Sequence, residues 1–209
     1  MIAPYNLRGL LVIISGPSGT GKGTVIKSLC NSNSRINILP SVTTRSPRTG
    51  EKEGHSYFFK TKDEFMEMVR QNKLIEWVEY CGNFYGTPRD QLENSLEEGF
   101  DVILEKDVIG ALEIKKAYPD SVTIFIAPPS LNELKRRIES RGTESADIIE
   151  KRLNRALEEL EYISNYDYVV VNENVEETAN AINCIITAEK FKTKRSKDIS
   201  QKIKFHEVK

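Results

Sequence analysis

The feature that most constrains this chain is a short apolar run followed directly by a glycine-rich loop. Residues 10–14 are all aliphatic, and residues 16–24 read Gly-Pro-Ser-Gly-Thr-Gly-Lys-Gly-Thr. A continuous apolar run of this length indicates a strand buried on both faces of a parallel sheet. Glycines allow backbone N–H groups to point inward at phosphate oxygens, and a lysine at the start of the next helix reaches the terminal phosphates. The segment therefore predicts a strand, a phosphate-binding loop (P-loop) and a helix that begins near Thr24.

Every residue of this loop is a candidate for binding ATP. The candidates are Gly16, Pro17, Ser18, Gly19, Thr20, Gly21, Lys22, Gly23 and Thr24. Gly23 departs from the general pattern, in which a Ser or Thr hydroxyl at that position binds Mg²⁺, and Thr24 comes one place later. We therefore expect Mg²⁺ to be held mainly through the nucleotide phosphates and water, and we assign no protein residue as a metal ligand. The run Gly-Lys-Gly-Thr is similar to that of small nucleotide kinases of the adenylate kinase type.

Strand-like and helix-like segments alternate along the rest of the chain. Further apolar runs lie at residues 102–104, 122–126 and 168–171, with helix-length segments at about 110–117, 131–163 and 175–190. This alternation predicts βαβ units and therefore an α/β fold, with a P-loop core whose parallel β-sheet is flanked by helices. Between residues 39 and 91 the pattern changes to short strand-like pieces, such as 55–59 and 75–80, which indicates an insertion. Residues 134–155 form a second interruption, helical and highly charged, with a break at Gly142.

The length and the overall charge limit the class of protein. The chain has 209 residues, which suits one domain with insertions better than two domains. Thirty Lys and Arg stand against 31 Asp and Glu, and this balance argues against a protein that binds nucleic acid through bulk charge. We expect no nucleic-acid partner and, since the early apolar run is too short for a signal peptide or a membrane span, no membrane partner.

The cysteines and the end of the chain carry two further expectations. Cys30, Cys81 and Cys184 are odd in number and widely spaced, which fits neither a disulfide framework nor a zinc site. A reducing, cytoplasmic location is the simpler interpretation. Residues 190–209 hold eight Lys or Arg against two acidic residues. Such a run is usually a solvated tail, and contact with an anion or a nucleic acid is the lesser alternative.

Several motifs in the insertion and beyond it resemble one family. Residues 41–59 contain Ser-Val-Thr-Thr-Arg-Ser-Pro-Arg and end in Tyr-Phe-Phe, residues 75–77 read Ile-Glu-Trp, and residues 82–88 read Gly-Asn-Phe-Tyr-Gly-Thr-Pro. With Ile-Ala-Pro-Pro-Ser at 126–130 and Arg-Gly-Thr at 141–143, they resemble the guanylate kinase family from about residue 9 to 190. The resemblance implies Mg²⁺-dependent transfer of phosphate from ATP to GMP or dGMP, giving ADP and GDP, as in purine nucleotide metabolism. It leaves the oligomeric state open.

The resemblance also implies how the chain is divided. The kinase domain would span about residues 4–190, and its core would comprise about 4–39, 92–133 and 156–190. A GMP-binding lobe would occupy about residues 40–91, a helical lid about 134–155, and a basic tail 191–209.

The GMP site implied by the resemblance has a phosphate end and a base end. Arg45, Arg48, Tyr57 and Tyr85 would hold the phosphate, which two guanidinium forks and two phenol hydroxyls suit well. Glu76 would read guanine, because an ionised carboxylate only accepts hydrogen bonds, and guanine offers N1–H beside its 2-amino group whereas adenine has a bare N1. The hydroxyls that complete base recognition would be those of Ser41 and Thr87.

The transfer itself is assigned, again by resemblance, to a set of cations. These candidate catalytic residues are Lys22, Arg45, Arg137, Arg141 and Arg152. Asn172 would lie near the donor adenine, and Glu105 and Asp107 would face the metal or the acceptor nucleotide.

Two residues beside these acids depart from the family pattern Ile-Leu-Glu-Ile-Asp-Val-Gln-Gly. They are Lys106 and Ile109. A lysine in place of a buried isoleucine must either extend to solvent or find a partner, since an unpaired buried ammonium is costly.

Two other functions compete with this interpretation. One is a small kinase acting on ribose 1,5-bisphosphate, which shares the P-loop; Glu76 and the phosphate-binding set argue against it. The other is a non-catalytic guanylate-kinase-like module that binds phosphorylated peptides and has lost a working P-loop. Lys22 and the lid arginines argue against that module.

Overall fold

The centre of the protein is a five-stranded parallel sheet with the order β2-β7-β1-β8-β9. The computed structural model describes residues 8–140, 146–195 and 204. The strands are β1 (Leu11–Ser15), β2 (Ile36–Ile38), β7 (Asp101–Glu105), β8 (Val122–Ala127) and β9 (Tyr168–Val171). The α/β fold with a parallel sheet is confirmed, and the four apolar runs all form strands. The edge strand β2 was not anticipated, because it has only three residues and contains Asn37.

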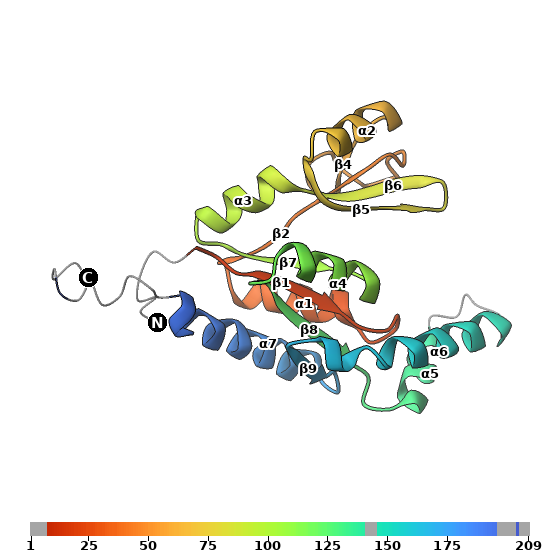
Figure 1. Ribbon diagram of the computed structural model, residues 1–209. Helices are drawn as coiled ribbons and strands as arrows, with labels where there is room; N and C mark the ends of the chain where they lie inside the picture. The colour runs from red at the N-terminus through yellow and green to blue at the C-terminus, as the bar shows by residue number, and fades with distance from the viewer. Residues whose placement is uncertain (1–7, 141–145, 196–203, 205–209) are drawn as a thin grey trace.

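Helices cover both faces of this sheet (Figure 1). On one face Val12 and Ile14 pack with buried residues of α1 (Lys22–Ser32) and α7 (Val175–Lys190). On the other face Leu11 and Ile13 pack with α3 (Arg89–Glu97) and α4 (Val108–Ala117). Because successive side chains of a strand point to opposite faces, a strand covered on both sides must be apolar throughout. This explains the uninterrupted run of aliphatic residues that precedes the P-loop.

The insertion folds into a second sheet with its own small core. Its strands β3 (Ser41–Thr43), β4 (Tyr57–Phe59), β5 (Leu74–Tyr80) and β6 (Asn83–Pro88) have the order β4-β3-β6-β5. The helix α2 (Lys62–Arg70) packs on this sheet through Phe65, which is fully buried with Val42, Leu74 and Phe84. We call residues 41–88 the lobe; Figure 1 shows that it stands apart from the core sheet.

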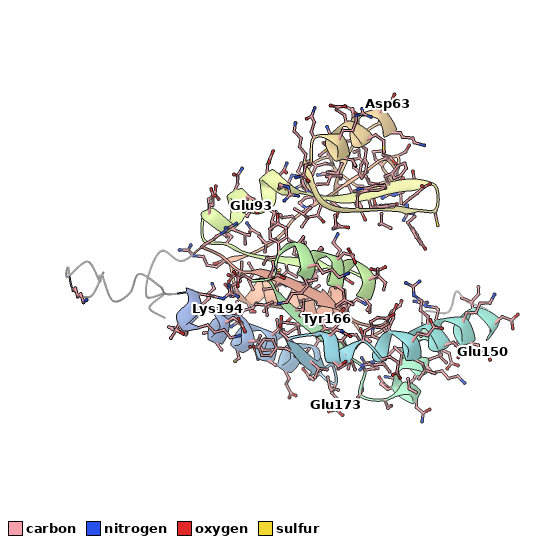
Figure 2. All side chains as sticks on the ribbon, in the orientation of Figure 1. Asp63, Glu93, Glu150, Tyr166, Glu173 and Lys194 are labelled. Carbon is pink, nitrogen blue, oxygen red and sulfur yellow. The ribbon has the colours of Figure 1, made fainter. Side chains whose placement is uncertain are left out.

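Gly142 lies outside the described residues, and the segment expected to be helical from 131 to 163 with a break there is divided. It forms α5 (Leu131–Glu139), α6 (Ala146–Leu160) and the short 3₁₀ turn η1 (Ile163–Asn165). Leu134 and Ile138 of α5 are buried with Ala156 of α6, so the two helices form one unit, which we call the helical pair. Asp63 on α2 and Glu150 on α6 mark two separate parts that project from the core (Figure 2).

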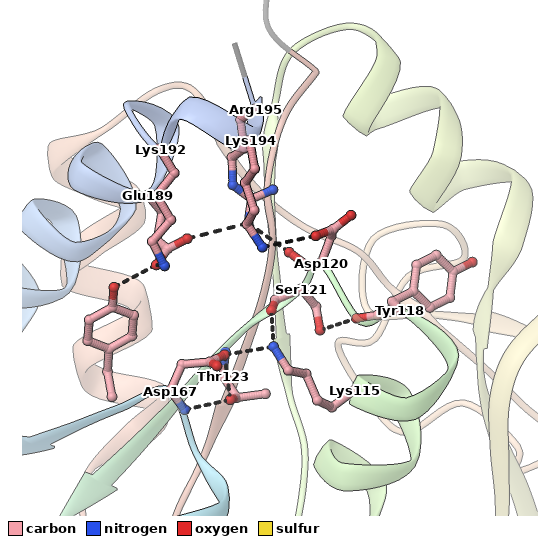
Figure 3. A network of polar contacts seen from close by, with 11 residues as sticks. Lys115, Tyr118, Asp120, Ser121, Thr123, Asp167, Glu189, Lys192, Lys194 and Arg195 are labelled. Atoms are coloured by element: carbon pink, nitrogen blue, oxygen red, sulfur yellow. Dashed lines mark hydrogen bonds and ion pairs between the residues drawn. The ribbon is translucent and has the colours of Figure 1, made fainter. Parts of the chain in front are cut away.

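Part of the basic end of the chain is docked on the core, where we expected a solvated tail (Figure 3). Lys194 pairs with Asp120 at 3.0 Å, and Nη2 of Arg195 donates to the backbone oxygen of Asp120 at 2.8 Å. Lys192 and Arg195 also pair with Glu189, whose side chain is only 2% exposed. Residues 191–194 remain exposed, as expected of a solvated segment, but Asp120 and Glu189 bind the basic side chains to the core, which the sequence did not predict.

A second polar cluster beside this docked segment joins three elements of the core. Oδ2 of Asp167 accepts hydrogen bonds from the backbone and hydroxyl of Thr123 and from Nζ of Lys115, at 2.8, 2.9 and 2.9 Å (Figure 3). Lys115 also donates to the backbone oxygen of Ser121. The cluster ties the start of β9 to β8 and α4.

Among the described residues, no helix combines the length and the apolar character needed to span a membrane. All three cysteines lie in the described part of the chain, and their thiols are free.

Candidate nucleotide-binding site

The P-loop connects β1 to α1 and is shaped by glycines at two points. Gly16 has φ 137°, and a Cβ at this position would lie 2.2 Å from the backbone oxygen of Ile126, so only glycine fits against β8. Gly21 has φ 87° and is the N-cap of α1, which begins at Lys22 and so starts earlier than we expected. The positive end of α1 therefore faces the loop, as an anion-binding loop requires.

Lys22 lies across this loop. Its Nζ donates to the backbone oxygens of Gly16 at 2.7 Å and Pro17 at 3.1 Å. The ammonium is thus held at the loop by its own backbone, within reach of phosphates that the loop would bind.

Asn172 supports the loop from the end of β9. Its Nδ2 donates to the backbone oxygen of Thr20 at 2.7 Å, and its Oδ1 accepts from the hydroxyl of Thr178 at 3.1 Å. The side chain is 2% exposed and touches Gly21, where a Cβ would lie 2.7 Å from Nδ2. The sequence placed Asn172 near the donor adenine; the structure places its side chain directly behind the P-loop.

The helical pair brings two of the predicted lid arginines to the loop. Nη2 of Arg152 donates to the hydroxyl of Ser18 at 2.5 Å, and Nη2 of Arg137 donates to the backbone oxygen of Asn172 at 3.0 Å. Leu134 and Ile138 pack against Gly19, which fixes α5 beside the loop. Arg141 lies outside the described residues.

Glu133 holds the arginines of α5 in place. Its carboxylate accepts hydrogen bonds from Arg136 and from Nε of Arg137. These bonds from Arg136 and then Arg137 lower the pKa of Glu133 to about 2. Sequence reasoning missed Glu133, although its spacing of four residues from Arg137 is a recognised pairing distance on a helix.

Glu105 is the last residue of β7, and Asp107 lies two residues further on; the two carboxylates have different surroundings. Glu105 faces the P-loop: a Cβ on Gly23 would lie 3.8 Å from its Oε2. Asp107 is the N-cap of α4, where its Oδ1 accepts from the backbone N–H of Gly110 at 2.8 Å.

The lobe gathers three of the residues predicted to hold the GMP phosphate. The guanidinium of Arg45 lies 5.3 Å from the ring centre of Tyr57, and the ring centres of Tyr57 and Tyr85 are 6.1 Å apart. Nη2 of Arg45 donates to both carboxylate oxygens of Glu51, at 2.8 and 2.9 Å. Oε2 of Glu51 also accepts from the backbone N–H of Arg48 at 2.8 Å.

Sequence reasoning missed Glu51, which sets the position of Arg45 and of the loop that carries Arg48. The hydrogen bond from Arg45, followed by the one from the Arg48 backbone, lowers the pKa of Glu51. The carboxylate therefore stays ionised near neutral pH and keeps the guanidinium oriented.

The predicted base-reading residues meet on the lobe sheet. Glu76 and Thr87 are direct cross-strand partners on β5 and β6, and the Thr87 hydroxyl donates to Oε1 of Glu76 at 2.7 Å. Ser41 precedes Val42, which pairs with Gly86, so Ser41 lies on the strand next to Thr87.

The unusual lysine at position 106 also meets this group. Its Nζ lies 2.6 Å from Oε1 of Glu76 and 2.9 Å from the hydroxyl oxygen of Thr87. Of the two alternatives expected for Lys106, extension to solvent or a partner, the structure shows the partner. Ile109, the other departure, is 58% exposed on α4.

A parallel α/β core with a P-loop, a lysine across the loop and nearby arginines defines a P-loop phosphotransferase. The guanylate kinase family model matches residues 8–189. The guanylate kinase of Bacillus anthracis is 53% identical over 189 residues, which cover 90% of this chain and 92% of that protein. The guanylate kinase of Bacillus subtilis (strain 168) is 52% identical, with 90% and 93% covered. The crystal structure of guanylate kinase from Anaplasma phagocytophilum matches with a TM-score of 0.70 at 38% identity and covers 90% of each chain. This chain belongs to the guanylate kinase family, and it is therefore an enzyme of the nucleoside monophosphate kinase class.

Proposed function

We propose that this chain catalyses the ATP-dependent phosphorylation of GMP to GDP, with dGMP as a second acceptor. The observation that carries the proposal is the pair formed by Glu76 and Thr87. The Glu76 carboxylate is largely buried on the lobe, and a hydrogen bond from the Thr87 hydroxyl fixes its position. A P-loop alone leaves the acceptor undecided, whereas this carboxylate favours an acceptor with adjacent N–H donors, which guanine has.

The donor side is built on the P-loop. Its backbone N–H groups and the start of α1 bind the ATP phosphates, and Lys22 moves from the backbone oxygens of Gly16 and Pro17 to the terminal phosphates. Asn172 keeps the loop in this shape through Thr20. The loop thereby places the γ-phosphoryl group at the end of the core sheet.

The acceptor side is built on the lobe. Glu76 accepts from N1–H and the 2-amino group of guanine, and Ser41 and Thr87 lie beside it. The phosphate of GMP is bound by the guanidinium groups of Arg45 and Arg48 and the hydroxyls of Tyr57 and Tyr85. These groups orient a phosphate oxygen for attack on the γ-phosphorus of ATP.

Phosphoryl transfer depends on neutralising the negative charge that spreads over the transferred group. Lys22, Arg137 and Arg152 supply positive charge around the P-loop, and Arg45 supplies it from the lobe. We assign Arg141 to the same group by its position in the family motif. Closure of the lobe (about 40–91) and the lid (about 134–155) on the core excludes water, so that ATP is not hydrolysed.

The residues around the P-loop fit a hydrated Mg²⁺ ion. The Glu105 carboxylate lies beside Gly23, and Mg²⁺ typically combines one or two carboxylates with phosphate oxygens and water. Phosphate oxygens and water would hold most of the ion, Glu105 would contribute one carboxylate, and the ion would supply positive charge against the ATP phosphates. Asp107 is engaged as the N-cap of α4 and lies two residues further on.

We place the enzyme in the cytoplasm, as its three free cysteines favour a reducing compartment. The expected partners are ATP and GMP, without nucleic acid or a membrane.

The test is release of ADP from ATP by the full chain with four acceptors: GMP, dGMP, AMP and ribose 1,5-bisphosphate. We expect turnover with GMP, less with dGMP, and almost none with the other two. Preference for ribose 1,5-bisphosphate would support the alternative small kinase. GMP binding without turnover would support the non-catalytic module.

A further inference from the structure

Lys106 joins the core to the base-reading end of the lobe. It follows β7 of the core sheet, whereas its partners Glu76 and Thr87 belong to β5 and β6 of the lobe. The side chains of Lys106 and Glu76 are only 16% and 13% exposed. This is a specific, largely desolvated contact rather than a loose surface ion pair.

The hydrogen bonds of this group are distributed unevenly. Oε1 of Glu76 accepts from both the Lys106 ammonium and the Thr87 hydroxyl, and the ammonium also donates to that hydroxyl. An ammonium has three donors and a carboxylate about four acceptor positions. Within the described part of the chain, no third acceptor bonds to Nζ of Lys106 and no donor bonds to Oε2 of Glu76. One donor of Nζ and one carboxylate oxygen, Oε2, thus remain for a ligand, on two side chains that contact each other.

This arrangement of a donor beside an acceptor matches one edge of guanine. Guanine presents its 6-oxo group, an acceptor, next to the donor N1–H, and the 2-amino donor follows. The carboxylate satisfies N1–H and the 2-amino group, which leaves the 6-oxo group facing the ammonium. Adenine presents the reverse, a 6-amino donor toward the ammonium and a bare N1 toward the carboxylate.

We propose that Lys106 is a specificity-determining residue that donates a hydrogen bond to the 6-oxo group of guanine. The proposal rests on the proposed function of the same site, and it adds a direct reader for the atom that Glu76 cannot bind. When guanine engages both oxygens of Glu76, the ammonium of Lys106 directs its remaining donor to the 6-oxo oxygen and stays next to the carboxylate. With adenine in the site, the Lys106 ammonium and the Glu76 carboxylate would each face a group that cannot pair with it. Both residues would therefore disfavour AMP.

The test compares wild type with Lys106→Met on GMP, IMP, 6-thio-GMP and AMP. IMP keeps the 6-oxo group and N1–H but lacks the 2-amino group, and 6-thio-GMP replaces the 6-oxo oxygen by a weaker acceptor. We expect Lys106→Met to lower kcat/KM for GMP and IMP by the same factor, about 10- to 100-fold, which is the usual effect of losing a hydrogen bond to a charged group. The preference of wild type for GMP over 6-thio-GMP should disappear in the variant, and the preference for GMP over AMP should shrink.

Two further variants separate recognition from folding. Lys106→Arg retains charged donors and should recover part of the preference for GMP over 6-thio-GMP. Lys115→Met removes another lysine from a partly buried ion pair, that with Asp167, and should change no nucleotide preference. Thermal unfolding of each variant measures the loss of stability, independently of the ratios of kcat/KM between nucleotides.

Two results would overturn the proposal. A rise in kcat/KM for GMP in Lys106→Met would show that the lysine only competes with guanine for Glu76. If the ratio of kcat/KM for GMP to that for 6-thio-GMP were the same in Lys106→Met and wild type, the lysine would only stabilise the position of the lobe. A wild-type protein that fails to phosphorylate GMP would instead overturn the proposed function, and the two failures are therefore distinguishable.

Discussion

The hydroxyl of Thr87 donates to Oε1 of Glu76 at 2.7 Å, directly across the β5–β6 pair. The bond fixes the rotation of a carboxylate that would otherwise be an ordinary strand residue. A base reader of this kind depends on position as much as on charge, because both oxygens must face the purine edge.

Glu76→Gln is expected to remove the preference for GMP over AMP. The amide replaces one acceptor oxygen by an NH₂ group, which faces the N–H donors of guanine, and the loss in kcat/KM for GMP should be at least about 100-fold. Glu79→Gln is the matched control, since Glu79 lies on the same strand but is exposed. Steady-state kinetics with both nucleotides measure the effect; an unchanged preference would remove Glu76 from the base site.

Lys22→Ala is expected to abolish most turnover while GMP binds almost normally. The ammonium lies across the P-loop of the core, whereas the residues that we assign to the GMP base and phosphate belong to the lobe. Loss of one such charge from a transfer site typically costs about 100- to 1,000-fold in kcat. Lys27→Ala, on the exposed side of α1, is the control. Retention of most of the wild-type rate by Lys22→Ala would contradict the P-loop assignment.

Glu51→Gln is expected to raise the KM for GMP about tenfold with a smaller effect on kcat. The carboxylate binds Nη2 of Arg45 through both oxygens and also binds the Arg48 backbone, so its loss frees the guanidinium that we assign to the GMP phosphate. Titration of GMP at saturating ATP measures the change. If KM stayed at the wild-type value, Glu51 would have no part in positioning Arg45.

Substitution by alanine should affect Tm differently at two glycines of the P-loop, Gly16 and Gly23. A Cβ at Gly16, which has a positive φ, would lie 2.2 Å from the Ile126 backbone oxygen, whereas a Cβ at Gly23 would make only an ordinary contact, 3.8 Å from Oε2 of Glu105. Gly16→Ala should therefore lower Tm by many degrees. Gly23→Ala should leave Tm unchanged or raise it slightly, because alanine reduces the freedom of the unfolded chain. Thermal unfolding of both variants tests this; equal losses would contradict the packing of Gly16 on β8.

The Asp167 cluster predicts a pH dependence of stability. Burial raises the pKa of Asp167, but the hydrogen bonds from Lys115 and Thr123 outweigh burial, so the pKa lies below its ordinary value of 3.8. A depressed carboxyl pKa stabilises the fold at pH values above the unfolded pKa, and that stability is lost as pH falls through the folded pKa. Denaturant unfolding should show wild type more stable than Asp167→Asn at pH 7, with the difference narrowing below about pH 4. A difference that stayed constant over this range would contradict the role of the charge.

Much of the core could be predicted from the sequence because its strands are buried on both faces. Residues such as Val12 and Ile13 must both be apolar when helices cover the two sides of the sheet. The lobe was less predictable: α2 and α3 were not anticipated, and β6 contains Gly86 and Pro88, which are poor indicators of a strand. The docking of Lys194 on Asp120 joins positions far apart in the chain, and no local pattern reports it.

The candidate site likewise contains residues that could be predicted from the sequence and residues that could not. The P-loop is contiguous, so its shape follows from its own glycines and its residues could be named from the sequence. Glu51 and the partner of Lys106 required the folded structure, because their roles depend on which side chain each one reaches, whereas Glu133 could have been found from its helical spacing to Arg137. The lysine itself could be identified as needing a partner from the cost of burying an unpaired ammonium.

The most direct test of the account is to identify the products that the purified full chain forms from ATP and GMP with Mg²⁺. Guanylate kinase activity predicts one GDP for each ADP released, and almost no ADP when AMP replaces GMP or when no acceptor is present. ADP formed without GDP, or an absence of turnover while GMP binds, would contradict it.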